Sequence, residues 1–512
     1  MKLKISRFIA LTLSIILIIS SSISASAYTG SAKLYYSASN AAPLTLSENA
    51  ADVYSSAGFT SVVDYIAEQV MAFEDEIDIS SYNIYTDDMM DVFQTLTYYH
   101  PELINLKNYY SYTYFSSKGT VAEFIPYYWF TEAEKDNYFI PFYNEMDSIV
   151  SQAEGMPDDF SKVLFVHDYL VSSCEYDTAV YNSSYQNDDV TIYNAYGCLV
   201  NKRCVCQGYS VAFKAIMDRL SIESDYVSSD AMNHVWNTVT IDGSTYHIDV
   251  TFDDPVEDVL GSVYHDNFLC TDEEISANHY YWTTSAEITS EPCEDNFWRD
   301  ITSKICLSGD YMYYSDFDSI SYSHLEKRNI NTGETEIIPS ELTGSLWFVP
   351  NSNAYYLGCY SRIELIGDTI YYSVPNGISS IKTDGTCDTR LYTVSTDTVG
   401  NIYGFSIKDN NAYIQVSEKP SSNFEKMMLD VYIPSEEPDN PEPLIGDVNS
   451  DGLIDINDVT YIQKHLVGYM NTDGQALIDE SDSVEFKIAD FNGDGFIDIN
   501  DATAVQRKLA GN

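Results

Sequence analysis

The pattern of apolar positions in the middle of the chain predicts a helix followed by a β-hairpin. From residue 206 onward apolar side chains recur every three or four residues, the spacing of one helix face. They are Tyr209, Ala212, Phe213, Ile216, Met217 and Leu220. From residue 234 to residue 250 apolar and polar residues alternate instead, as they do along strands, and Asp242-Gly243 interrupts them with a strong turn signal.

The hairpin register brings one histidine and one aspartate to the same face. A two-residue turn at 242–243 places Trp236 opposite Asp249. His234 then lies one diagonal step from Asp249, roughly 7–8 Å between backbones, which side chains can bridge. Cys206 stands at or just before the helix N-terminus, where the dipole and free N–H groups favour a thiolate. A thiol facing an imidazole and a carboxylate is the arrangement of cysteine-nucleophile enzymes.

Three short motifs follow one another in this stretch. They are Cys-Gln-Gly-Tyr-Ser at 206–210, His-Val-Trp-Asn at 234–237 and His-Ile-Asp-Val-Thr-Phe-Asp-Asp-Pro at 247–255. In this order they resemble the bacterial transglutaminase-like superfamily, over roughly residues 158–255. The resemblance implies an α+β, papain-like core, a catalytic triad of Cys206, His234 and Asp249, and no cofactor for catalysis.

The implied reaction is acyl transfer at an amide bond of a protein or peptide. The Cys206 thiolate attacks the carbonyl, His234 accepts the thiol proton and returns it to the leaving amine, and Asp249 holds the imidazole tautomer. Water as the second acceptor gives a peptidase or amidase, whereas an amine gives a cross-linking transglutaminase. The motifs leave both open, and bacterial members of this kind favour hydrolysis.

Neighbouring residues are expected to support this site. Cys204 and Gln207 flank the nucleophile, and the backbone N–H of Cys206 is the default oxyanion donor, with Tyr196 as a weaker side-chain candidate. His167, on a helix expected over 163–170, is interpreted as structural and left out of the triad.

Two other interpretations of these residues are weaker. The triad could be a core cysteine, a hydrogen-bonded strand histidine and a turn acid, but their order and shared face argue against this. A zinc site of Cys204, Cys206, His234 and His247 is disfavoured, because two cysteines one residue apart are a poor structural zinc spacing.

The chain begins with the pattern of a secretory signal peptide over residues 1–27. Lys2, Lys4 and Arg7 precede an apolar run from residue 8 to about residue 19, and Ala-Ser-Ala at 25–27 is a small-residue cleavage site. The run is too short for a comfortable membrane span, and no later stretch is apolar and long enough to anchor the mature chain. We therefore expect a secreted, extracellular protein without a membrane anchor.

Residues 28–155 are rich in tyrosine and partly helical. One amphipathic helix is marked by Val63, Ile66, Val70 and Phe73. Thr-Glu-Ala-Glu at 131–134 is a capping-box signature that opens another helix, with Phe142, Met146 and Ile149 facing inward. The region carries no recognisable chemistry and is expected to pack on the catalytic domain at 156–296.

The pattern changes to short aromatic strands over residues 297–434. Leu-Ser-Gly-Asp-Tyr-Met-Tyr-Tyr at 307–314 recurs as Leu-Ile-Gly-Asp-Thr-Ile-Tyr-Tyr at 365–372, with a weaker echo at 407–414. Such repeats resemble propeller blades, yet about three units is fewer than the usual 4–8, so a β-rich accessory domain is predicted. Its tyrosines are expected to pair across strands rather than bind sugar or peptide. Residues 435–445 form a proline-punctuated linker.

Two loops near the C-terminus repeat one pattern of oxygen ligands. Each has Gly at loop position 6 for a sharp turn and ligands at positions 1, 3, 5, 7, 9 and 12, as in EF-hand loops, although position 12 is Asp rather than Glu. The ligands are Asp447, Asn449, Asp451, Leu453, Asp455 and Asp458 in one loop and Asp490, Asn492, Asp494, Phe496, Asp498 and Asp501 in the other. A helix is expected after each loop, and two calcium ions are predicted.

Paired loop-helix units of this kind resemble a type I dockerin, over residues 446–512. The resemblance implies a cohesin domain of a scaffoldin as the partner, and attachment to a cellulosome or the cell surface. The implied cohesin contacts are Ile456, Asn457, Gln463, Lys464, Ile499, Asn500, Gln506 and Arg507. An insert near 470–487 is longer than usual for the family. The alternative function is a non-catalytic cellulosomal binding or structural subunit acting in polysaccharide degradation.

Composition limits the partners. The 512 residues carry a formal net charge of −52, and removing the three positive charges of residues 1–27 makes it −55. So acidic a surface argues against nucleic acid and anionic lipid as partners. Nine cysteines fit one free nucleophile with up to four disulfides, or a fully reduced set. The whole is predicted to be multidomain, with a transglutaminase-like core, a β-rich accessory domain and a small α-helical calcium-binding dockerin.

Overall fold

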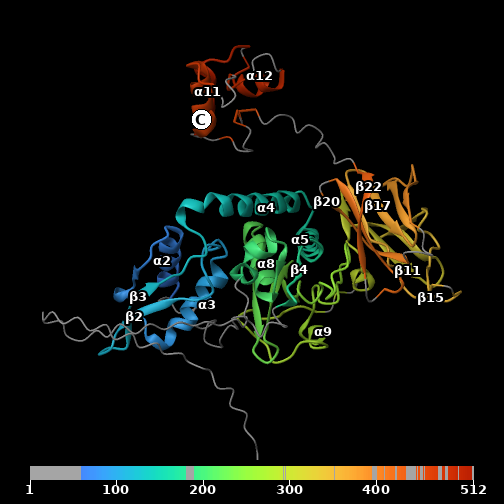
Figure 1. Cartoon of the computed structure of the whole chain (residues 1–512), viewed down its shortest axis with the longest axis horizontal. Coiled ribbons are helices and arrows are strands. Elements are labelled where there is room, and N and C mark those ends of the chain that lie inside the picture. The colour runs from blue at the N-terminus through green and yellow to red at the C-terminus, as the bar shows by residue number, and fades with distance from the viewer. Residues whose placement is uncertain are drawn as a thin grey trace, which may run out of the picture. The chain divides into compact units, whose positions relative to one another are not determined.

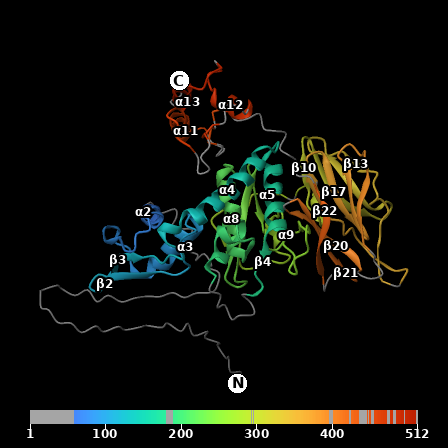
Figure 2. The ribbon, with the colours of Figure 1, turned by 45° about the horizontal axis from the view of Figure 1, so that its top comes forward.

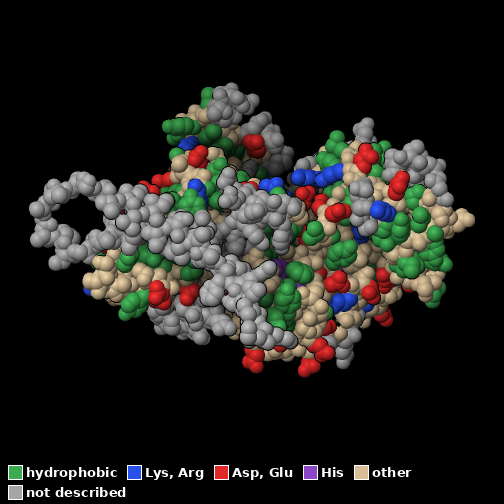
Figure 3. Space-filling model, turned by 60° about the horizontal axis from the view of Figure 1, so that its bottom comes forward, with side chains coloured by type: hydrophobic (Ala, Val, Ile, Leu, Met, Phe, Trp, Pro, Cys, Tyr) green, Lys and Arg blue, Asp and Glu red, His purple; other side chains and the backbone are tan. Residues whose placement is uncertain are grey.

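The computed structural model consists of two compact units, Met1–Tyr432 and Ile433–Asn512. The described residues are 59–179, 189–291, 293, 296–350, 352–394, 400–408, 410–420, 424–433, 445–446, 448–449, 454, 456–470, 476–478, 483–493 and 495–509. The predicted signal peptide lies outside them. Over these ranges no helix combines the length and apolar character needed to cross a membrane. Acidic side chains are scattered over the face shown in Figure 3, with Lys and Arg between them.

A small α+β layer opens the first unit (Figure 1). Its elements are α2 (Phe59–Met71), β1 (Ile77–Asp78), η1 (Ser80–Tyr82), η2 (Thr86–Asp88), α3 (Met89–Tyr99), β2 (Ser111–Phe115) and β3 (Thr120–Ile125). The strands form an antiparallel sheet in the order β1-β3-β2. The predicted amphipathic helix is present but ends at Met71. Phe73 has a φ of 58°, a left-handed conformation that a helix cannot continue through.

The central part joins a helical layer to a four-stranded sheet. Its elements are η3 (Glu132–Glu134), α4 (Asp136–Glu154), α5 (Asp159–Ser173), β4 (Glu175–Tyr176), η4 (Val190–Tyr193), α7 (Ala195–Leu199), β5 (Arg203–Cys204), α8 (Cys206–Arg219), β6 (Ser224–Ser229), β7 (His234–Ile241), β8 (Ser244–Ile248), α9 (Asp272–Ile275) and β9 (Thr283–Thr284). The sheet order is β8-β7-β6-β9, and β4 and β5 form a separate parallel pair. The predicted capping box at 131–134 is present, but it opens η3, and α4 follows.

Helix α8 is buried on all sides rather than on one face. Every residue from Cys206 to Met217 is buried, and Figures 1 and 2 show α8 between α3 and α5. The polar side chains of this helix are satisfied internally. The Ser210 hydroxyl donates to the Val235 carbonyl at 3.0 Å, and the Lys214 ammonium donates to Asp218 at 2.6 Å. Because protein surrounds α8, its first residue, Cys206, is held in a fixed position.

The β7–β8 hairpin has the register expected from its turn. Ile241 pairs with Ser244, and the ladder continues to Asn237 opposite Ile248. Asp242 and Gly243 have φ of 51° and 78°, the two positive values that a type I′ turn requires.

Three antiparallel meanders build the β-rich region. After η5 (Phe297–Asp300) the strands are β10 (Cys306–Ser308), β11 (Tyr311–Asp318), β12 (Tyr322–Asn329), β13 (Thr335–Ile338), β14 (Trp347–Phe348), β15 (Tyr355–Tyr356), β16 (Ile363–Ile366), β17 (Thr369–Val374), β18 (Gly377–Lys382), β19 (Thr389–Thr393), β20 (Asn401–Lys408), β21 (Asn411–Ser417) and β22 (Glu425–Tyr432). The sheets are β10-β11-β12-β13, β16-β17-β18-β19 and β20-β21-β22, with β14-β15 as a separate pair. Each of the three repeated segments forms the first hairpin of one meander.

The second unit is helical. Its helices are α11 (Ile456–Leu466), α12 (Ser483–Ala489) and α13 (Ile499–Leu509). Val459 and Ile462 of α11 pack with Ala502 and Val505 of α13 in a small buried core. Helices α11 and α13 are those expected after the two loops, whereas α12 lies in the insert, where no element was expected.

Candidate active site

Cys206 is the first residue of α8, and its side chain is 1 % exposed. Val205 before it has an extended backbone and serves as the helix cap. No acidic residue occurs in the first turn of α8. The N-terminal end of the helix dipole therefore acts on the sulfur without an opposing charge from that turn.

His234 and Asp249 form a short buried pair. His234 opens β7, and Asp249 directly follows β8 on the neighbouring strand. The imidazole Nε2 lies 2.6 Å from Asp249 Oδ2. The other carboxylate oxygen accepts backbone N–H groups from Thr251 at 3.0 Å and Phe252 at 3.1 Å. Both oxygens of the Asp249 carboxylate thus take part in hydrogen bonds, which fix its position.

The surroundings of this pair favour the charged forms of both residues, the His234 imidazolium and the Asp249 carboxylate. Burial lowers the pKa of His234, but the charge and hydrogen bond of Asp249, together with the nearby Cys206 thiol, raise it to about 10. Burial raises the pKa of Asp249, but the charge of His234 and hydrogen bonds from His234 and His279 hold it well below its usual range. Because Asp249 engages Nε2, Nδ1 is the imidazole nitrogen left for the thiol.

A second histidine, which the sequence interpretation missed, binds the same carboxylate. His279 is buried, and its Nε2 lies 2.7 Å from Asp249 Oδ2. The rings of Trp236 and Phe252 each lie within 5.5 Å of both imidazoles, centroid to centroid. His279 lies thirty residues after Asp249, beyond α9, so no local periodicity points to it.

A chain of hydrogen bonds, buried except at the exposed Asn278, continues from His279. Its successive members are His279, Asn278, Asn267, Asp253, His167, Asp168 and His265. Asp168 also accepts the backbone N–H of Ile305 at 2.7 Å, just before the first β-rich meander. His167 thus belongs to a network behind the site, as its structural interpretation proposed. Its pKa is about 9, since bonds and charges from Asp168 and Asp253 outweigh burial.

The zinc alternative is wrong, because its four ligands are otherwise engaged. His247 Nδ1 accepts from the indole N–H of Trp236 at 3.1 Å, and its Nε2 lies 2.9 Å from Asp272. Cys204 lies with Cys174 and Cys198, not with the two histidines. In the described part of the chain the proposed set does not converge on one point.

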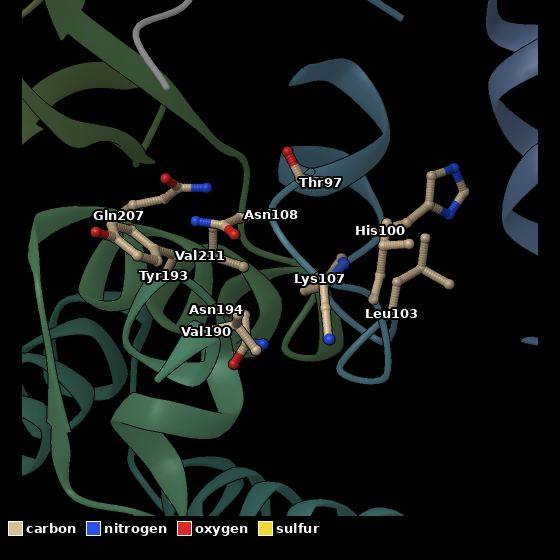
Figure 4. Close-up of a pocket in the computed structure, with 12 residues that line it drawn as sticks. Thr97, His100, Leu103, Lys107, Asn108, Val190, Tyr193, Asn194, Gln207 and Val211 are labelled. Atoms are coloured by element: carbon tan, nitrogen blue, oxygen red, sulfur yellow. The ribbon is translucent and has the colours of Figure 1, made fainter. Parts of the chain in front are cut away.

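A pocket lies between the N-terminal layer and the start of α8, where Gln207 follows Cys206 (Figure 4). Gln207, predicted as a supporting residue, lines it together with Thr97, His100, Pro101, Leu103, Leu106, Lys107, Asn108, Val190, Tyr193, Asn194 and Val211. Tyr196 is placed elsewhere, with its ring 5.6 Å from Trp129 and 5.9 Å from Tyr138, centroid to centroid. The N-terminal region therefore contributes a wall next to the site, which its sequence had not indicated.

Both aspartates at position 12 of the calcium loops are fully buried. Asp458 accepts the backbone N–H groups of Val448 at 2.8 Å and Asn449 at 3.2 Å. Asp501 accepts those of Asn492 at 3.1 Å and Asp498 at 2.8 Å. The other described predicted ligands are Asp490, whose carboxylate accepts from Gly495, and Phe496.

Several predicted residues of this unit fall outside the description. They are Asp447, Asp451, Leu453, Asp455 and Asp494, and the side chains of Ile456 and Asn457. The remaining predicted cohesin contacts, Gln463, Lys464, Ile499, Asn500, Gln506 and Arg507, are exposed.

All nine cysteines lie among the described residues, and each is a free thiol. The count of nine cysteines allowed either up to four disulfides or a fully reduced set, and the structure has the fully reduced set.

Solved structures with partial likeness include three enzymes or candidate enzymes. One described as a TGase is 19 % identical, with a TM-score of 0.20, covering 24 % of this chain and 33 % of its own. A candidate cysteine protease from Cytophaga hutchinsonii is 20 % identical (TM-score 0.17), covering 24 % and 44 %. The arylamine N-acetyltransferase NAT3 from Bacillus cereus, described with a Cys-His-Glu catalytic triad, is 10 % identical (TM-score 0.18), covering 50 % and 94 %. The chain spans a third of the first and under half of the second, and TM-scores this low carry no argument.

Family models match two separate parts of the chain. The transglutaminase-like superfamily matches residues 147–250, and the dockerin type I domain matches residues 445–510. A comparison with curated proteins returns no match. Both resemblances seen in the sequence are thereby confirmed: the chain carries a transglutaminase-like domain and a C-terminal type I dockerin domain.

Proposed function

We propose that this protein is a secreted, cellulosome-associated cysteine enzyme that transfers acyl groups from amide bonds of protein substrates. One observation carries the proposal: His234 Nε2 lies 2.6 Å from Asp249, and the thiol at the tip of α8 is close enough to the same imidazole to help raise its pKa. Nucleophile, base and orienting acid thus have the mutual contacts that acyl transfer requires.

The reaction runs in two halves. In the first, the Cys206 thiolate attacks the amide carbonyl, and the protonated His234 gives its proton to the leaving amine as the C–N bond breaks. This leaves a thioester on Cys206. In the second, His234 removes a proton from the acceptor, the acceptor oxygen or nitrogen attacks the thioester, and the thiolate leaves. Asp249 stays ionised throughout and stabilises the imidazolium.

The oxyanion of each tetrahedral intermediate needs hydrogen-bond donors. The backbone N–H of Cys206 points out of the N-terminus of α8, where no carbonyl of the helix accepts it. The pocket lined by Gln207 is the proposed position for substrate groups beside the scissile bond. It is small, about 30 Å³, and combines apolar side chains with the Lys107 ammonium and the amides of Asn108 and Asn194, so it suits a small polar group rather than a whole side chain.

The test is substrate profiling with a labelled peptide and protein mixture, with and without a primary amine. We expect wild-type protein to release or exchange amines and to form a thioester on Cys206 that intact mass spectrometry detects. Cys206→Ala should abolish both, whereas Cys359→Ala, which removes a buried thiol of the β-rich region, should retain them. Product formed only with water assigns a peptidase or amidase, and cross-linked product assigns a transglutaminase. Full activity in Cys206→Ala would overturn Cys206 as the nucleophile, whereas no activity in the wild-type protein would favour the non-catalytic subunit.

The dockerin domain is proposed to tether the enzyme through two calcium ions to a cohesin domain of an extracellular scaffoldin. Type I dockerin domains bind calcium, and the described residues fit that ion. Asp490, Asn492, Asp498 and Asp501 offer only hard oxygen donors, and Asp501 is drawn inward by two backbone N–H groups. Calcium offsets the mutual repulsion of these carboxylates, so docking should depend on it.

A further inference from the structure

Three buried thiols converge directly behind the proposed nucleophile. The sulfurs of Cys174, Cys198 and Cys204 all lie within 4.8 Å of one another, and those of Cys174 and Cys204 are 3.5 Å apart. None of the three residues exceeds 1 % exposure. They come from three different elements, the end of α5, α7 and β5.

Local structure holds this triangle in place. The parallel pair β4–β5 sets Tyr176 opposite Cys204, which brings Cys174, two residues earlier, to the same end. Helix α8 crosses close over the cluster at Gly208. A Cβ there would lie 2.5 Å from Cys204 Cβ and 2.9 Å from its sulfur, so the crossing requires glycine.

The surroundings of the thiols are polar rather than purely apolar. Tyr209 lies close to the three thiols, and its hydroxyl donates to the buried Asp254 carboxyl at 2.5 Å. The Lys202 ammonium is close enough to act electrostatically on Cys198. A cluster of cysteines that only fills space needs neither a positive charge nor buried oxygen groups beside it.

We propose that Cys174, Cys198 and Cys204 bind one thiophilic metal ion of the zinc class. Three sulfur donors without competing carboxylate ligands select such ions over calcium or magnesium. With metal–sulfur bonds of about 2.3 Å, tetrahedral sulfurs lie about 3.8 Å apart. The Cys174–Cys204 separation of 3.5 Å is close to that distance, and the other two separations do not exceed 4.8 Å. Binding displaces the thiol protons, and the Lys202 ammonium, which also pairs with Glu145, lies close to the negative charge that three thiolates bring to one ion.

The geometry favours a metal over a disulfide. A disulfide would join two of the sulfurs and leave the third as an unpaired buried thiol, whereas all three are mutually close here. The ion would be structural, because it touches no residue of the proposed triad. It would fix β5, and with it the start of α8, since Cys204 precedes Cys206 by two residues.

The test uses the full chain, reduced, freed of transition metals and saturated with calcium so that the dockerin loops are filled. Cd²⁺ is titrated as the probe, because cadmium–thiolate bonds give an ultraviolet charge-transfer band that oxygen ligands do not. We expect the band to saturate at one Cd²⁺ per chain and to be bleached by Zn²⁺. It should persist in Cys206→Ala and in Cys387→Ser, which removes an exposed thiol, and should be lost in Cys198→Ser.

A second measurement needs no variant, in case Cys198→Ser does not fold. Wild-type protein in mild denaturant is alkylated with and without Zn²⁺, and each cysteine is mapped by mass spectrometry. Zinc should protect Cys174, Cys198 and Cys204 at least tenfold, with buried Cys359 unchanged as the internal reference. The proposal would be overturned if Cys359 were protected equally or if the wild-type protein gave no thiolate band. It would also be overturned by an unchanged band in folded Cys198→Ser, or by a disulfide among the three cysteines that persists with metal present.

Discussion

Replacing Asp249 by asparagine tests the candidate site most directly. The substitution keeps the size of the side chain and one oxygen. It removes the negative charge, and it cannot supply acceptors both to the two backbone N–H groups and to the two imidazoles that the carboxylate now serves. His234 therefore loses its partner at Nε2 without a large change in packing.

The size of the effect follows from the pKa of His234. Its value of about 10, against an ordinary value of 6.5, corresponds to roughly 4–5 kcal/mol that favours the imidazolium, at about 1.4 kcal/mol per unit. The charge of Asp249 makes the largest contribution to the rise in the pKa of His234. Losing it should lower kcat by about 10³–10⁴, the range seen when a triad loses its orienting carboxylate. KM should change little, because no proposed substrate contact is removed.

The same pair makes stability depend on pH in a defined direction. The raised pKa of His234 contributes stability that is complete below about pH 6.5 and is lost as pH rises toward 10. The depressed pKa of Asp249 contributes stability that is present above about pH 4 and is lost as pH falls below it. Stability from this pair is therefore greatest between about pH 4 and pH 6.5. Asp249→Asn should flatten the alkaline slope, leaving the part due to His167, whose pKa is about 9.

The assay combines kcat on the substrate found by profiling with urea unfolding from pH 4 to pH 10, and circular dichroism confirms the fold. Asp272→Asn is the matched control, because Asp272 also binds a histidine of the same sheet, His247, but away from Cys206. It should retain wild-type kcat within about threefold. If Asp249→Asn folds and keeps its rate, or if Asp272→Asn loses as much, the wrong carboxylate has been placed in the triad.

Three further predictions follow from the geometry. His279→Phe removes one charge-assisted hydrogen bond to Asp249, worth about 1.5–3 kcal/mol. It should lower kcat roughly 10- to 100-fold. An unchanged rate with an intact fold would mean that His279 serves only in packing. Gly208→Ala forces a Cβ into Cys204 and should destabilise the first unit by about 3 kcal/mol or more. Thermal unfolding is compared with Gly155→Ala, where the added Cβ meets only the Gln152 carbonyl at 3.2 Å. Equal small losses would contradict the tight crossing. In the dockerin, changing either Ile456-Asn457 or Ile499-Asn500 to charged residues should leave cohesin affinity nearly intact, because the two halves repeat. Changing both pairs should abolish binding, as measured by calorimetry. If one pair alone accounts for most of the affinity, the two halves are not equivalent.

Local patterns in the sequence determined much of this site. Helical spacing after Cys206 and alternation around Asp242-Gly243 predicted α8 and the β7–β8 hairpin. A turn with two residues of positive φ permits one register, and that register alone brought His234 within reach of Asp249. The dockerin domain was equally recognisable, since each repeat of its loop pattern lies within twelve consecutive residues. Each of these features depends on residues that are close in sequence.

Only the tertiary structure decided what surrounds them. His279 reaches Asp249 across a loop and a short helix, and Cys174 meets Cys204 through a two-residue parallel pair. The complete burial of α8 also depends on layers from distant parts of the chain. Such contacts follow from how whole elements pack, and packing leaves no periodic trace around any single residue. The sequence therefore determined the nucleophile's helix and the base–acid hairpin, whereas the second histidine and the thiol triangle emerged only from the folded chain.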